Sequence, residues 1–89
     1  MVKELNSERV RNFFSRFFRT EKLGNEDDIF AGGYVNSLFA MQLIAWLEEE
    51  FRVVVVDSDL QISNFNSVSS IVAFVERKTT ETRGEAVAP

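Results

Sequence analysis

The first periodic segment of the chain carries apolar residues at the spacing of a helix. Five apolar side chains recur at i, i+3, i+4, i+7 and i+8, which places them on one helical face: Val10, Phe13, Phe14, Phe17 and Phe18. Asn6 or Ser7 can cap this helix, and residues 1–5 before it are expected to be frayed. We predict that the phenylalanine face is buried in a core. The alternative is a basic amphipathic helix that lies on a membrane.

Residues 20–35 lack this periodicity and are predicted to form a long loop. Leu23, Ile29 and Phe30 are its expected anchors in the core. The acidic run at 26–28 is interpreted as a solvated loop. A metal site there is the alternative, but consecutive carboxylates rarely converge without further oxygen ligands, so no metal site is predicted. Gly32 and Gly33 are expected to supply positive φ angles for the turn into the next helix.

The segment 37–51 is predicted to be a second helix with two apolar faces. One face, at about 100° per residue, carries a bulky set and its flanks: Phe39, Leu43, Trp46 and Leu47, with Ala40, Ile44 and Phe51. Leu38, Met41 and Ala45, here called the Leu38 strip, fall on the opposite side and lead to Glu48 and Glu49. A small bundle cannot bury both faces, so we expect the Leu38 strip to be exposed and to contact partner proteins. The alternative is that another segment of the chain covers it.

The rest of the chain predicts shorter elements and one more long helix. Residues 52–56 are rich in valine but have no partner strand, so an extended crossing segment is expected. Residues 57–65 are predicted to hold a weak helical turn with Leu60, Ile62 and Phe65 as apolar contacts. A last helix capped by Ser67 would end at Lys78, and its core face would be Val68, Ile71, Val72 and Val75, with Phe74 on the edge. The predicted fold class is all-α, a small four-helix bundle of three main helices plus one short helix, with residues 1–78 as a single domain and 79–89 as a disordered C-terminal tail.

Composition excludes several kinds of chemistry. The 89 residues include no cysteine and no histidine, so the chain has no thiol, no usual zinc ligand and no nucleophile–histidine pair. The net charge of −4 is uneven: residues 1–22 carry +3, residues 23–78 carry −6 and residues 79–89 carry −1. An acidic surface disfavours nucleic acid and favours a positively charged protein partner. With no apolar run of membrane-spanning length and no apolar signal core, the chain is expected to be cytoplasmic. It is also expected to be a monomer.

A short motif opens the second helix. Gly33 precedes Asn36, Ser37 and Leu38, and Asn36 can cap the helix so that Ser37 lies where unpaired N–H groups and the helix dipole favour an anion. The segment 28–51, DIFAGGYVNSLFAMQLIAWLEEEF, resembles the phosphopantetheine-attachment region of acyl carrier proteins. In that family a glycine is followed by Asp or Asn, then Ser, then Leu or Met. Two differences are that Asp is commoner than Asn before the serine, and that Gly33 lies four rather than three positions before Ser37, a spacing also found among stand-alone carriers.

The resemblance, which extends over about residues 6–78, implies a carrier-type bundle that a transferase modifies. The 4′-phosphopantetheine arm would be attached covalently to Ser37, and Gly33, Asn36 and Leu38 would position that serine. The face that would meet partner enzymes comprises Leu38, Met41, Ala45, Glu48 and Glu49. The implied partners are a phosphopantetheinyl transferase and an acyl-loading enzyme, synthase or acyltransferase domains. The chain itself would not be an enzyme, and the arm would supply the thiol that the sequence lacks.

A second resemblance concerns the acyl group, or cargo, that the arm would hold. Residues 30–43 are similar to stand-alone carriers of polyketide or mixed peptide–polyketide assembly, of the kind used in antibiotic biosynthesis. Some of these hold unusual extender units of the methoxymalonyl or aminomalonyl type. The chain would then hold an acyl or aminoacyl intermediate as a thioester. The alternatives are a carrier of fatty-acid synthesis, a non-carrier helical protein–protein interaction module, and an autonomous enzyme.

Overall fold

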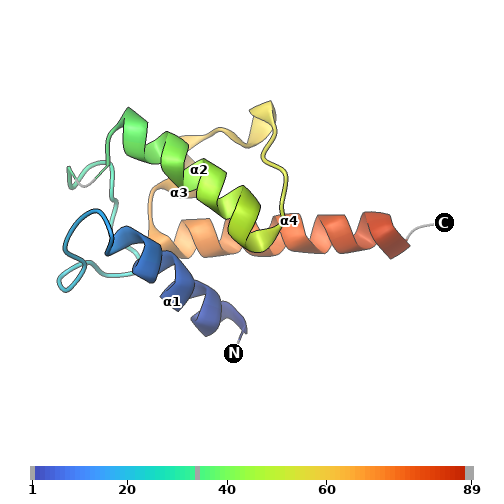
Figure 1. The fold of residues 1–89 in the computed structure, drawn as a ribbon, viewed down its shortest axis with the longest axis horizontal. Helices are drawn as coiled ribbons and strands as arrows, with labels where there is room; N and C mark the ends of the chain where they lie inside the picture. Colours follow the sequence, from blue (N-terminus) through green and yellow to red (C-terminus); the bar gives the residue numbers. More distant parts are fainter. Residues whose placement is uncertain (1, 34, 88–89) are drawn as a thin grey trace.

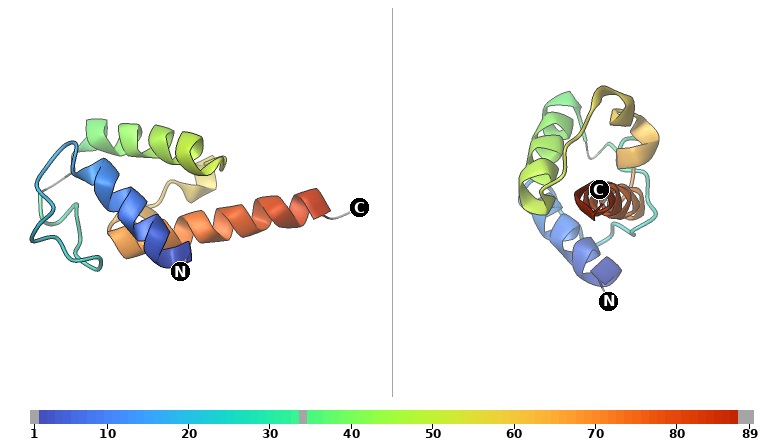
Figure 2. Two further views of the ribbon diagram at one scale, coloured as in Figure 1. Left: turned by 60° about the horizontal axis from the view of Figure 1, so that its bottom comes forward. Right: turned by 90° about the vertical axis from the view of Figure 1, so that its right-hand side faces the viewer.

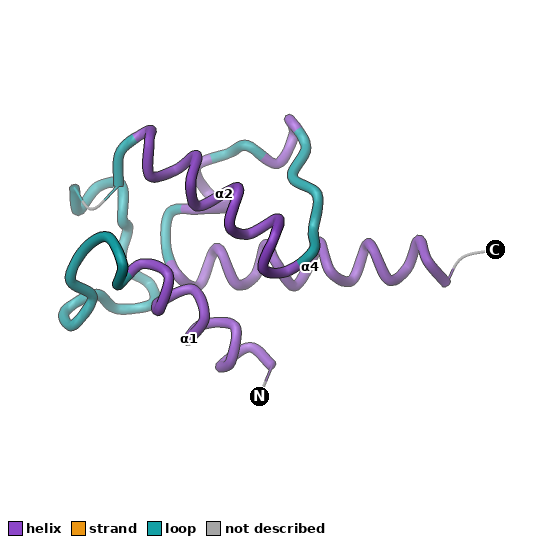
Figure 3. Tube along the Cα trace, in the orientation of Figure 1, coloured by secondary structure: helices purple, strands orange, loops and turns teal. Residues whose placement is uncertain are grey.

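The computed structural model describes the backbone of residues 2–33 and 35–87, and the side chains of residues 5–33 and 35–80. In chain order the helices are α1 (Val2–Phe14), α2 (Ser37–Phe51), the 3₁₀ turn η1 (Asp57–Asp59), α3 (Ile62–Phe65) and α4 (Val68–Val87). No strand occurs within these described ranges, and loops join the helices (Figure 3). The structure therefore confirms the predicted all-α fold, with three longer helices and one short one.

α4 is the helix against which the others pack. It contacts α1, α2 and α3, and the view along it shows α2 and α3 on either side (Figure 2). The C-terminal half of α4 extends past the other helices (Figure 1). One core joins the four helices and the long loop, and its largest fully buried side chains are Phe14, Phe74, Ile29, Leu43, Leu47 and Ile71.

α1 is displaced toward the N-terminus relative to its prediction. It begins at Val2 rather than after residue 5, and Asn6 is a buried residue inside the helix instead of its cap. It ends at Phe14, where Phe17 N–H donates to the Phe14 carbonyl over 2.9 Å in a tighter, three-residue turn. The predicted five-residue stripe is therefore cut short, and the Phe17 side chain is 46% exposed.

Aromatic side chains join α1 to α2. Phe13 is stacked on Trp46 with ring centroids 4.5 Å apart. Arg9 lies over the Phe51 ring at 4.3 Å and pairs with Glu50 at 2.7 Å. Because Phe13 and its neighbour Phe14 are buried in this contact, the alternative in which this face of α1 lies on a membrane is wrong.

The loop between α1 and α2 is held by its own turns. Leu23 and Ile29 are buried and Phe30 is partly buried, which confirms the three predicted anchors. Asp27 accepts a hydrogen bond from the Gly24 N–H at 2.8 Å. Asp28 accepts from two backbone N–H groups, each at 2.9 Å. The acidic run thus caps turns in an exposed loop, in agreement with the solvated-loop interpretation.

The segment between α2 and α4 is only partly as predicted. Arg52 ends α2 in the left-handed conformation (φ 58°, ψ 44°), and residues 52–56 then cross the bundle without pairing as a strand. Phe65 is buried, but Leu60 and Ile62 are 53% and 65% exposed. Of the three predicted apolar contacts only Phe65 is therefore buried, because α3 is a four-residue helix with room for one inward side chain.

α4 is longer than predicted. Ser67 caps it, since the Ser67 Oγ accepts from the Ser70 N–H at 3.0 Å. The predicted core face is buried, but Phe74 is fully buried rather than on the edge. The helix continues to Val87 instead of ending at Lys78, and residues 88–89 lie outside the described backbone. This extension includes Gly84. A glycine inside a helix costs only about 1 kcal/mol relative to alanine, which is too little to end a helix that is already formed. The disorder of the tail stays a prediction.

A polar cluster fixes the α2–α3 connection to α4. Lys78 Nζ lies 2.8 Å from Asp59 Oδ2, and the two side chains are 14% and 18% exposed. The Val56 N–H donates to the same Asp59 oxygen at 3.0 Å. The hydrogen bond from Lys78, followed by that from Val56, holds the pKa of Asp59 below its ordinary value. Asp59 therefore stabilises the fold in its charged form.

Asp59→Asn is expected to lower the free energy of unfolding at pH 7 by about 1–2 kcal/mol, because Lys78 and Val56 lose a charged acceptor. The pKa is depressed in the folded state, so this contribution is complete above the unfolded pKa of about 3.9 and is lost as pH falls through the lower folded value. Urea unfolding of both proteins between pH 7 and pH 2.5 measures this. A stability difference that stays constant to the lowest pH would contradict it.

Candidate functional site

The motif serine begins α2, directly after the long loop that follows α1 (Figure 1). Ser37 is the first residue of the helix and its side chain is exposed. Asn36 is the N-cap, in an extended conformation (φ −122°, ψ −178°). Its Oδ1 accepts the Phe39 N–H at 2.9 Å, and its carbonyl accepts the Ala40 N–H at 3.0 Å. The predicted cap is confirmed, and it fixes the backbone on which Ser37 stands.

The Ser37 hydroxyl is accessible from solvent. Among the residues that the structure describes, no side chain or backbone group forms a hydrogen bond with it. The first N–H groups of α2 have no partner within the helix, and the helix dipole makes this end positive. The chain contains no histidine or cysteine that could activate this hydroxyl.

Gly33 makes the turn that leads to the cap. Its φ of 80° confirms the positive angle predicted for Gly33, whereas Gly32 does not have a positive φ and the prediction for that residue is wrong. An added Cβ would meet no atom within 4 Å, so space does not require glycine at this position. What requires it is the backbone angle, which is unfavourable for a residue with a side chain. The turn before the cap of α2 therefore depends on the backbone freedom of Gly33.

The Leu38 strip is exposed along α2. Leu38 and Met41 are 65% and 70% exposed, and Ala45 is exposed as well. The opposite face, with Phe39 at its start, is buried. The expectation of an exposed strip is confirmed, and the alternative that another described segment covers it is wrong. Its role as a contact surface stays a prediction.

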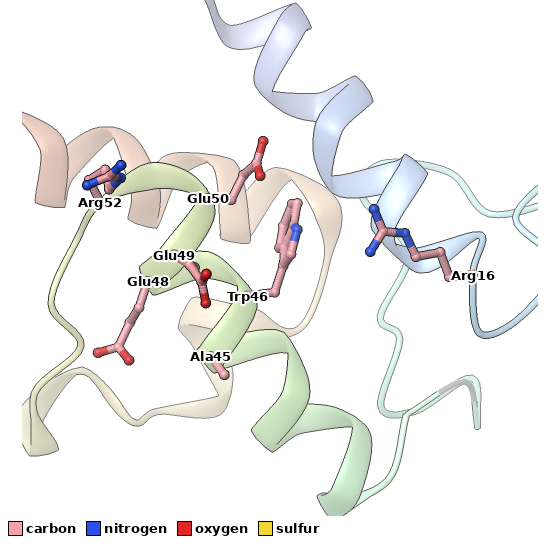
Figure 4. Close-up of a pocket in the computed structure, with 7 residues that line it drawn as sticks. All are labelled: Arg16, Ala45, Trp46, Glu48, Glu49, Glu50 and Arg52. Atoms are coloured by element: carbon pink, nitrogen blue, oxygen red, sulfur yellow. The ribbon is translucent and has the colours of Figure 1, made fainter.

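The acidic end of α2 borders a groove of about 860 Å³ (Figure 4), here called the Trp46 groove. Trp46 and Arg16 face each other across it, while Glu48 and Glu50 point to opposite sides of α2. The lining residues are Arg16, Ala45, Trp46, Glu48, Glu49, Glu50 and Arg52. The sequence analysis did not place Arg16 here, because it lies 29 residues or more from the rest of the lining and only the fold brings it close.

The carboxylates of this groove are not equivalent. Glu50 is paired with Arg9 at 2.7 Å, and Glu48 Oε2 accepts the Val55 N–H at 2.9 Å. Glu49 is exposed and has neither a hydrogen bond nor an ion pair with any residue in the described part of the chain. Of the two glutamates predicted to meet partners, Glu49 is therefore the one whose charge is available.

A second, smaller groove of about 230 Å³ lies beside the motif. It is here called the Phe17 groove, and its lining is Phe17, Phe18, Asn36, Leu38, Phe39 and Gln42. The sequence analysis missed it because Phe17 was expected inside the core. The half-exposed ring of Phe17 and the neighbours of Ser37 meet only because α1 ends at Phe14.

Two further searches of the described residues gave no additional site. No three of their acidic side chains are placed to hold a metal ion. None of their helices combines the length and apolar character needed to cross a bilayer.

Comparison of the sequence with known protein families gives a match that spans most of the chain. The family model of the phosphopantetheine attachment site matches residues 8–75, a range that includes Ser37 and all of α2. No curated protein sequence reaches the threshold for a match. The matched range covers most of the chain, from within α1 to within α4. This chain belongs to the family of phosphopantetheine attachment domains, helical carriers of the acyl carrier protein kind to which 4′-phosphopantetheine is covalently attached.

Proposed function

We propose that Ser37 is the residue that carries the arm, and that the chain is an acyl carrier protein. The observation that supports this most is the exposed, unbonded hydroxyl at the capped start of α2. When bound, 4′-phosphopantetheine supplies a thiol for a thioester, which a chain without cysteine cannot provide itself. The role of this protein is then to be modified and loaded by partner enzymes.

The residues around Ser37 fit a phosphodiester. Its negative charge would lie at the positive end of α2, where the N–H groups of the first turn have no partner within the helix and only that of Phe39 is taken up by the cap. Asn36 keeps that end ordered through its bond to Phe39. Leu38 leaves a large apolar side chain in solvent next to the reacting hydroxyl. A transferase can contact Leu38 while its active site reaches Ser37 without unfolding the helix.

We also propose that the Leu38 strip and Glu49 together form the contact face for these enzymes. Leu38, Met41 and Ala45 offer apolar area, and Glu49 offers a charge that nothing in the described chain neutralises. Apolar contact supplies affinity, whereas the charge directs the encounter with a basic surface.

Glu49→Lys is therefore expected to slow modification by a phosphopantetheinyl transferase roughly two- to fivefold at low salt, the size of effect given by one exposed charge pair. The difference should shrink at high ionic strength because exposed charges are screened. The measurement is kcat/KM for the carrier at two salt concentrations. Glu21→Lys is the matched control, since Glu21 is also exposed but lies in the α1–α2 loop rather than on α2. Equal rates for both variants would contradict the assignment of Glu49.

For the cargo, we propose an acyl or aminoacyl intermediate of polyketide or mixed peptide–polyketide assembly, with a malonyl-type extender unit as the narrower form. The support is the likeness of residues 30–43 to such carriers. The test is to isolate the protein from its native host and to weigh the arm and acyl group ejected in the mass spectrometer. A malonyl-type, other short polyketide-type or aminoacyl mass is the expected result. Long saturated chains alone would contradict this cargo and favour fatty-acid synthesis.

A further inference from the structure

The Phe17 groove lies directly beside the residue that we propose to carry the arm. Asn36 and Leu38, the two chain neighbours of Ser37, both line it. The other lining residues come from the turns after α1 and from the first half of α2. A flexible group fixed to Ser37 would therefore have this groove within reach.

The groove has an aromatic wall with an exposed edge. The Phe17 and Phe18 rings stand edge-on to Phe39, at centroid distances of 5.0 Å and 5.6 Å. Phe17 is nevertheless 46% exposed, and Leu38, which also lines the groove, is 65% exposed. Apolar area that remains in water costs about 25 cal/mol per Å² compared with its burial, so a group that covers these two side chains is stabilised.

Two amide side chains supply polar groups at the same place. Asn36 uses its Oδ1 to cap α2, which leaves its Nδ2 pointing to no acceptor among the described residues. Gln42 is exposed and forms no hydrogen bond with the part of the chain that the structure describes. The groove thus combines aromatic rings with amide donors and acceptors, which is the chemistry that recognises a chain of alternating apolar and amide units.

We propose that the Phe17 groove is a docking site for the pantetheine portion of the arm, an inference that rests on the proposed function of Ser37. Pantetheine alternates methyl and methylene groups with two amides, which match the rings and the Asn36 and Gln42 side chains. A volume of about 230 Å³ is below the roughly 300–1,000 Å³ of sites for drug-sized ligands. The groove therefore takes the branched segment near the phosphate and leaves the thiol and its cargo outside.

Docking of a tethered arm in this groove is weak and reversible. A group on a short flexible tether has an effective concentration of roughly millimolar. A groove with a dissociation constant of the same order is then occupied about half of the time. The arm alternates between a docked state against Phe17 and a free state that enters partner enzymes, and a partner that binds the free arm shifts this equilibrium.

NMR of the holo protein tests the proposal without any partner enzyme. The arm is installed by a phosphopantetheinyl transferase from coenzyme A, and the geminal methyl protons of the arm are observed. They are expected to shift upfield relative to free phosphopantetheine, because they lie near the aromatic rings, and to give nuclear Overhauser contacts with Phe17 or Phe39 protons. Phe17→Ala is expected to reduce both the shift and the contacts. Val54→Ala, at a side chain that is 67% exposed and outside the groove, is expected to retain them.

The outcomes separate this proposal from the one on which it rests. An adduct of the correct mass whose methyl protons match free phosphopantetheine would overturn the docking site and leave Ser37 as the attachment residue. No adduct on the wild-type chain would overturn the proposed function itself. Since the wild-type spectrum decides the matter, the proposal stays testable even if Phe17→Ala does not fold. Contacts of the arm with the α3 residue Ile62 in place of the phenylalanines would also overturn it.

Discussion

Ser37→Ala is expected to abolish transfer of phosphopantetheine to the protein while leaving the fold intact. Alanine removes the only atom of residue 37 that could form the phosphodiester, so the loss should be complete rather than partial. The cap is made by Asn36, not by Ser37, and alanine is a good helix former. The free energy of unfolding should therefore change by no more than about 0.5 kcal/mol. The measurement is incorporation of a fluorescent coenzyme A derivative by a broad-specificity transferase.

The matched control is Ser58→Ala. Ser58 is also exposed and also carries a primary hydroxyl, but it lies in η1 rather than at the start of a long helix. This variant should be labelled at the wild-type rate. Labelling of Ser37→Ala at any comparable rate would show that another hydroxyl accepts the arm.

Phe14→Ala is expected to have the largest effect on stability, about 3–5 kcal/mol. The Phe14 ring is completely buried, and it stands edge-on to Phe39 with centroids 5.6 Å apart. The surrounding helices cannot collapse fully into the space that the ring leaves, so a cavity adds to the lost burial. A domain of this size has a total stability of only about 4–13 kcal/mol, so much of that margin is lost.

Chemical denaturation followed by Trp46 fluorescence measures this change, because Trp46 stacks in the same aromatic contact between α1 and α2. Val54→Ala is the control, since that side chain is 67% exposed and should change stability by less than about 0.5 kcal/mol. Equal midpoints for the two variants would contradict the assignment of Phe14 to the core.

The central part of the fold could be predicted from the sequence because its signals are local. The bounds of α2, the Asn36 cap and the positive φ of Gly33 all follow from residues within a few positions of one another. The assignment of the Phe39 face to the core needed one further argument, that a small bundle has room for only one of two apolar faces. That argument is general, and the structure confirms it.

The features that were mispredicted depend on contacts between distant segments. Periodicity alone extends the α1 helix to Phe18, but the chain turns after Phe14 so that the loop can return to α4. Leu60 and Ile62 look like core residues in the sequence, yet the single turn of α3 directs only Phe65 inward. The length of α4 was missed because its last turns need no apolar pattern to remain helical.

In the candidate site, too, some features could be predicted from the local sequence and others depend on contacts between distant segments. The exposure of Ser37 and of the Leu38 strip could be predicted, because both depend on which way α2 faces. The difference between Glu48 and Glu49 could not be predicted, since the Glu48 carboxylate is bound by Val55 only after the chain folds back over α2. The Phe17 groove also depends on tertiary contact, because it forms where the end of α1 meets the start of α2.

The intact mass of the wild-type chain after incubation with coenzyme A and a phosphopantetheinyl transferase tests the central claim most directly. The account predicts that the mass rises by one phosphopantetheine unit, and that fragmentation places the whole increment on the peptide containing Ser37. An unchanged mass, or an increment on a peptide without Ser37, would contradict it.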